Sequence, residues 1–103
     1  MVKSQVDAAA TAVASAPRRA IIERLAVGEA SMSDLAGHLA VTLPAVDKHL
    51  RVLVAAGVVT KTKSGRTTSV RLVPGSLDGL ATWAMSTRLM WGNALDRLED
   101  HLS

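Results

Sequence analysis

The chain has 103 residues, of which 49% are hydrophobic, so it is long enough for a single domain with a core of modest size. It contains no cysteine, which excludes disulfides, thiolate metal sites and cysteine nucleophiles. The net charge of +3 is unevenly distributed, because residues 42–73 carry six basic residues against one acid, Asp47. This basic block predicts a surface for a polyanion, although a solvated face would have the same composition. A domain this small would also gain stability from a partner subunit, so we expect a homodimer.

The N-terminal segment superficially imitates a signal peptide, since Lys3 is followed by an alanine-rich run with an A-x-A end. Alanine is too weakly hydrophobic for the core of such a peptide, and Asp7 interrupts the approach to it. No stretch of the sequence approaches the length and hydropathy of a membrane span. We therefore expect a cytoplasmic protein that does not associate with membranes.

Two helices are expected before residue 29. Ser4 resembles the N-cap of a capping box with Asp7, and it opens an alanine-rich helix that runs to about residue 14. Such a helix can approach another helix closely, which makes Ala9 and Val13 candidate dimer contacts, although alanine's helix propensity alone would explain the run. Ser15 then caps a helix that ends before residue 28, and its apolar face predicts a core helix.

Residues 33–56 predict a helix-turn-helix. A short helix over 33–39 is separated by about three residues from a second helix that Thr42 can cap and in whose first turn Pro44 lies. The second helix has a buried back and a charged front. Its apolar residues at helical spacing are Val46, Leu50 and Leu53. In such a motif the second helix is the one presented to the DNA major groove.

Residues 58–73 predict a β-hairpin, because two runs of β-favouring residues flank a turn at Ser64 and Gly65. Lys63 and Arg66 lie beside the tip, where they could meet a phosphate row or a minor groove. By itself the hairpin is equally well explained as an edge whose lysines prevent aggregation. Next to a helix-turn-helix, it is the expected wing of a winged helix.

The last helix is expected over residues 77–102, with Ser76 as its cap. Its apolar face extends over nearly half the circumference, which is more than one small domain can cover. The expected partner is the same helix of a second subunit, although a ligand pocket beside the tryptophans is a rival interpretation. The predicted dimer contacts on this helix are Leu80, Trp83, Ala84, Trp91, Leu95 and Leu98.

Several stretches together give the chain a family likeness over nearly its whole length. They are residues 18–21, 43–46, 48–53, 56–59 and 65–67, together with the last helix. The chain resembles the ArsR winged-helix transcriptional regulators, and its last helix is similar to the branch of that family without metal sites. The resemblance implies a homodimeric repressor that dimerises through its first and last helices. It also implies binding to an inverted repeat through the second helix of the motif and the wing.

The chain departs from the metal-sensing members of the family. Ser31 and Ser33 stand where those members place two cysteines, and serine is a poor substitute for a thiolate ligand. The last helix does not reproduce the alternative carboxylate and histidine site, and the three histidines are scattered. We therefore expect no metal site and no cofactor.

Asp47 is a second departure, because the family usually has serine or another small polar residue there. A carboxylate facing DNA repels phosphate, but it can also accept a hydrogen bond from cytosine N4. Asp47 therefore either sharpens sequence choice or weakens affinity.

The sequence thus predicts one domain over residues 1–103, mainly α with a β-hairpin wing, that binds double-stranded DNA as a repressor. The predicted DNA contacts are Thr42, Leu43, Pro44, Asp47, Lys48, His49 and Arg51 from the helix, and Lys61, Lys63, Arg66 and Arg71 from the wing. A winged-helix protein-interaction module is the rival from another class. An enzyme is not expected, because no catalytic motif occurs at a recognisable spacing. Whether a small-molecule effector exists stays open.

Overall fold

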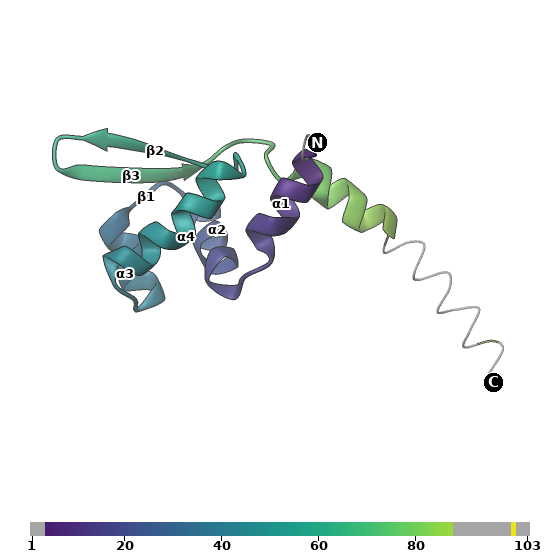
Figure 1. The fold of residues 1–103 in the computed structure, drawn as a ribbon, viewed down its shortest axis with the longest axis horizontal. Helices are drawn as coiled ribbons and strands as arrows, with labels where there is room; N and C mark the ends of the chain where they lie inside the picture. The colour runs from purple at the N-terminus through teal and green to yellow at the C-terminus, as the bar shows by residue number, and fades with distance from the viewer. Residues whose placement is uncertain (1–3, 88–99, 101–103) are drawn as a thin grey trace.

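The computed structural model describes residues 4–87 and 100 (Figure 1). The hairpin extends at one end of the molecule, and α1 lies with the C-terminal helix toward the other. That last helix is described over residues 78–87. The preceding elements are α1 (Gln5–Val13), α2 (Ala16–Val27), β1 (Ala30–Ser31), α3 (Met32–Leu39), α4 (Leu43–Ala55), β2 (Val59–Ser64) and β3 (Thr67–Leu72). No helix within the described ranges combines the length and hydropathy needed to cross a bilayer.

Hydroxyl side chains start all four labelled helices. Ser4, Ser15 and Thr42 accept backbone N–H bonds from the first turns of α1, α2 and α4, as the sequence predicts. The fourth cap differs from expectation, because α3 starts at Met32 with Ser31 as its N-cap rather than at residue 33. Only α3 carries both halves of a capping box in the described residues, whereas the box predicted for α1 shows the hydroxyl half.

Left-handed residues end the two helices of the motif. After α4, Gly57 has φ +73°, and Val58 N donates to Leu53 O at 3.0 Å. After α3, the same arrangement falls on Ala40, with φ 55°, and Val41 N donates to Ala36 O at 3.0 Å. Both are Schellman-type ends, in which a positive φ turns the chain back over the last carbonyls. The ends reverse the chain sharply before α4 and before β2.

The three strands form one antiparallel sheet in the order β1-β3-β2. Ser64 pairs with Thr67, so the hairpin turn consists of Gly65 and Arg66, one residue later than predicted. Gly65 has φ +62°, a conformation that glycine adopts without steric cost. The shift carries Arg66 into the turn itself. β1 pairs through Ala30 with Val70 and anchors the start of α3 to the hairpin.

The core joins α2, α3 and α4 to the sheet. Val46, Leu50 and Leu53 are fully buried, which confirms the predicted back of α4. The buried cluster consists of Ala12, Ile21, Leu25, Ala30, Leu35, Val46, Leu50, Leu53, Ala56, Val58, Val59 and Val70. Because α4 contributes its whole apolar stripe to this cluster, its opposite side is held toward solvent.

The start of the C-terminal helix differs from the prediction. Residues 74–77 form a turn and the helix begins at residue 78, so Ser76 does not cap it. Instead, Ser76 Oγ donates to Val58 O at 3.4 Å. Gln5 Nε2 reaches the same region and donates to Ala56 O and Ser76 O, at 3.4 and 3.3 Å. These bonds attach α1 and the turn to the end of α4. The predicted helical course over residues 88–99 and 101–102 lies outside the described residues.

Candidate nucleic-acid interface

The front of α4 presents the polar and charged residues predicted from the sequence. Lys48 and Arg51 are exposed on this front, and Pro44 and Leu43 are exposed in the first turn. Asp47 and His49 are half-buried, and the carboxylate of Asp47 stays partly accessible. Thr42 is exposed and its Oγ1 accepts from Ala45 N at 3.3 Å, so its hydroxyl is already engaged as the helix cap. The helix N-terminus and two cationic side chains therefore lie on the accessible side of the motif.

The wing distributes its four basic residues over two faces and the turn. Lys61 pairs directly with Val70, so it lies on the face of the hairpin that is turned to the core. Lys63, two residues along β2, shares that face, and Arg66 is exposed in the turn. Arg71 follows the buried Val70 and therefore lies on the opposite face. The structure brings Lys61, Lys63 and Arg66 to the side of α4 and directs Arg71 away from it.

Asp47 links the two parts of the predicted interface. Its Oδ2 lies 2.8 Å from Arg51 Nη2, one turn further along α4. Its Oδ1 lies 3.6 Å from Lys61 Nζ in β2. No local feature of the sequence indicates that the register of β2 brings Lys61 beside this carboxylate, so the pair was not predicted. In the free protein Asp47 is the acceptor of two ion pairs.

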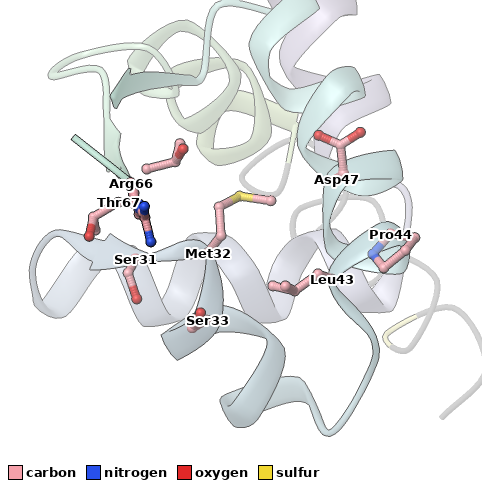
Figure 2. Close-up of a pocket in the computed structure, with 9 residues that line it drawn as sticks. Ser31, Met32, Ser33, Leu43, Pro44, Asp47, Arg66 and Thr67 are labelled. Atoms are coloured by element: carbon pink, nitrogen blue, oxygen red, sulfur yellow. The ribbon is translucent and has the colours of Figure 1, made fainter. Parts of the chain in front are cut away.

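A cleft of about 500 Å³ separates the N-termini of α3 and α4 from the start of β3 (Figure 2). Figure 2 shows Asp47 and Arg66 on opposite sides of it, with Met32 between them. The lining residues are Ser31, Met32, Ser33, Leu43, Pro44, Asp47, Arg66, Thr67 and Thr68. Five of these were not predicted as site residues, namely Ser31, Met32, Ser33, Thr67 and Thr68. The packing of α3 against α4 and the pairing of β1 with β3 together bring them beside α4.

Ser31 and Ser33, which were predicted not to hold a metal, have different surroundings. Ser31 is the N-cap of α3, with its Oγ accepting from Asp34 N at 3.0 Å, and Ser33 is exposed in the first turn. Among the described residues, no three histidine, aspartate or glutamate side chains gather at one point. His38 is exposed on α3, and His49 belongs to a different helix, α4.

The predicted dimer contacts have mixed positions. Trp83 is 56% exposed, and its neighbour Ala84 is exposed as well. Leu80 and Val13 are half-buried, whereas Ala9 is only 1% exposed and already packed within a single chain. Ala9 thus offers almost no surface to a partner. Three further predicted contacts, Trp91, Leu95 and Leu98, lie outside the described residues.

Comparisons with known proteins agree with this architecture. The family described as "Bacterial regulatory protein, arsR family" matches residues 16–61. The HTH-type transcriptional regulator Rv2034 of Mycobacterium tuberculosis is 42% identical over 76 residues, which cover 74% of this chain and 71% of that protein. A crystal structure of a "possible transcriptional regulator for arsenical resistance" is 37% identical, covers 94% of both chains and has a TM-score of 0.71.

The fold also occurs in a more distant protein. The solution structure of a homodimeric winged helix-turn-helix DNA-binding domain from Mycobacterium bovis has 22% identity, a TM-score of 0.64, and coverage of 90% of this chain and 83% of that one. At this identity the likeness concerns the fold, and it matches the observed order of helices and wing. The family match and the 42% identical relative, together with the shared fold, show that the chain belongs to the ArsR family of bacterial transcriptional regulators, which are not enzymes.

Proposed function

We propose that this protein is a homodimeric, sequence-specific DNA-binding repressor that recognises an inverted repeat. The observation that carries the proposal is the accessible front of α4 beside the wing. Lys48 and Arg51 on the helix and Lys63 and Arg66 on the hairpin are all exposed on the same part of the molecule. Positive charge of this kind supplies affinity for phosphates, while a helix front narrow enough for the major groove supplies base contacts.

The positions of the basic residues indicate which of them would contact bases and which would contact phosphates. Arg51 is well placed on the helix front to read a base edge, and Lys48 lies on the same front for a base or a phosphate. Lys63 and Arg66 would hold the phosphate backbone or enter the minor groove beside it. Arg71 lies on the far face of the hairpin, so its part in the interface would be the smallest of the wing residues.

Dimerisation is proposed on the exposed apolar surface of the C-terminal helix. Trp83 is 56% exposed in a single chain and shares a face of this helix with the half-buried Leu80, three residues earlier. An exposed large apolar side chain on such a face is typical of an interaction surface. The M. bovis neighbour, which shares the fold, is a homodimer. A two-fold dimer would present two copies of α4, and this is the reason to expect an inverted repeat.

Selection of bound duplexes from random DNA tests the proposal. The expected product is a pseudo-palindrome with half-site centres about one helical turn, or a small multiple of it, apart. Repression would then be tested by placing that site across a promoter and measuring transcription with and without the protein. If the selection enriches no sequence, the proposal of sequence-specific binding is wrong.

A protein-interaction module is the second candidate, because Asp47 neutralises part of the charge on α4 and the wing. Retention on duplex DNA at low salt separates the two functions. A DNA-binding protein is retained and is released steeply as salt rises, whereas an interaction module passes through at every salt concentration.

A further inference from the structure

One carboxylate in the candidate interface holds two cations from different elements. Asp47 on α4 contacts Arg51 of the same helix through Oδ2, at 2.8 Å. It contacts Lys61 of β2 through Oδ1, at 3.6 Å. Each oxygen therefore serves one cation. The Asp47 and Lys61 side chains are 32% and 34% exposed, so this pair is partly shielded from water, whereas Arg51 is 78% exposed.

The arrangement is produced by the fold. Asp47 and Arg51 are four residues apart on α4, the spacing at which side chains of a helix meet. Lys61 is aligned by the hairpin register, because its direct partner Val70 is fully buried and fixes that face of the hairpin toward the core. A slip of one residue would carry Lys61 to the other face and away from Asp47.

We infer that Asp47 is an internal competitor of DNA for Arg51 and Lys61. The inference rests on the proposed function of this surface and concerns its regulation by charge. Neither cation can contact a phosphate or a base at full strength while it remains paired with the carboxylate. Binding therefore exchanges an internal ion pair for a contact with DNA. The free energy of binding is less favourable by the free energy of the ion pairs that are broken.

This mechanism differs from simple repulsion between Asp47 and the phosphates. Repulsion acts directly on DNA and needs neither Arg51 nor Lys61. Competition acts only through these two cations and disappears when they are absent. The two accounts both predict tighter binding when the charge of Asp47 is removed, so a single substitution does not separate them.

The first measurement is the affinity of Asp47→Asn for duplex DNA. Asparagine keeps the size of the side chain and removes its charge. Surface ion pairs contribute little individually, so release of two of them is expected to raise affinity about three- to tenfold at low salt. The gain should shrink as salt screens the pairs. Glu23→Gln, which removes a negative charge from an exposed position on α2, is the matched control and should change affinity less than about twofold.

The decisive measurement repeats Asp47→Asn in a protein that also carries Arg51→Gln and Lys61→Gln. With no cation left to release, the gain should fall below about twofold. A gain of equal size in both backgrounds would overturn the inference in favour of direct repulsion. If the doubly substituted protein binds too weakly to measure, Lys61→Gln alone is used, and the logarithm of the gain should fall by about half.

The outcomes also separate this inference from the proposed function. Failure of the unmodified protein to bind any duplex would refute the proposed function itself. Binding by the unmodified protein with no gain in Asp47→Asn would refute only the competition. A loss of affinity confined to the selected sequence would show instead that Asp47 accepts a hydrogen bond from a base.

Discussion

Ser31 and Asp34 cap each other's backbone at the start of α3. Ser31 Oγ accepts from Asp34 N at 3.0 Å, and Asp34 Oδ2 accepts from Ser31 N at 3.2 Å. Ser31 also belongs to β1 and pairs with Ser69 of β3, so this cap fixes the point where the sheet passes into the helix-turn-helix. Ser31 thus has a structural role in this chain, as a helix cap and as a strand residue.

Ser31→Ala should lower the free energy of unfolding by about 1 kcal/mol, because the N–H of Asp34 loses its acceptor. Urea unfolding with an unchanged m-value would measure the loss. Ser33→Ala is the control, since Ser33 is exposed in the first turn and is not the cap. Equal stability of the two variants would contradict the assignment of the cap.

Ala40→Gly should stabilise the protein by about 0.5 to 1 kcal/mol. Ala40 has φ 55° and ψ 44°, and this left-handed conformation is strained for any residue with a Cβ. Glycine removes the strain, although it loses part of the gain to its greater freedom in the unfolded chain. Thermal unfolding checks the sign. A loss of stability would mean that the entropy of the unfolded state outweighs the strain.

Trp83→Glu should convert the proposed dimer to monomer at micromolar concentration, because a charge would replace a large apolar group in the interface. Loss of a buried tryptophan commonly costs about 2 kcal/mol or more of binding free energy. Sedimentation equilibrium measures the change. Val27→Glu is the control, since Val27 is 87% exposed on α2, outside the proposed interface. A stable monomer for the unmodified protein would refute dimerisation.

Arg51→Ala should weaken binding to the selected sequence by about 1 to 3 kcal/mol if the contact is bidentate to guanine. Preference at one base position should relax, while binding to unrelated duplexes changes less. Competition binding against a set of singly altered sites measures both effects. Uniform weakening across all sites would assign Arg51 to a phosphate instead.

Lys63→Ala should weaken binding evenly across sequences, because a wing lysine beside the backbone contacts phosphate. The slope of log affinity against log salt should become shallower by about 0.9, the value expected when one phosphate fewer is neutralised. Arg71→Ala is the comparison within the wing, since Arg71 lies on the opposite face of the hairpin. A larger loss of affinity for Arg71→Ala than for Lys63→Ala would mean that the other face of the wing meets DNA.

The sequence by itself determined the features that depend on neighbours in the chain. The helical spacing of Val46, Leu50 and Leu53 predicted the buried back of α4, because apolar residues at this spacing must share one face. Ser4, Ser15 and Thr42 predicted three helix starts, since an N-cap acts within one turn. The hairpin was also predicted from neighbours in the chain, because two β-favouring runs flank a glycine.

Only the tertiary structure decided which residues meet across the fold. The strand register placed Gly65 and Arg66 in the turn. It also set Lys61 beside Asp47, although the sequence around these two residues has no local signal for their contact. Packing within the chain likewise buried Ala9 and engaged Ser76 with Val58 instead of a helix cap. Local propensity acts over one turn or one strand pair, whereas a contact between α4 and the wing depends on how the core packs them together.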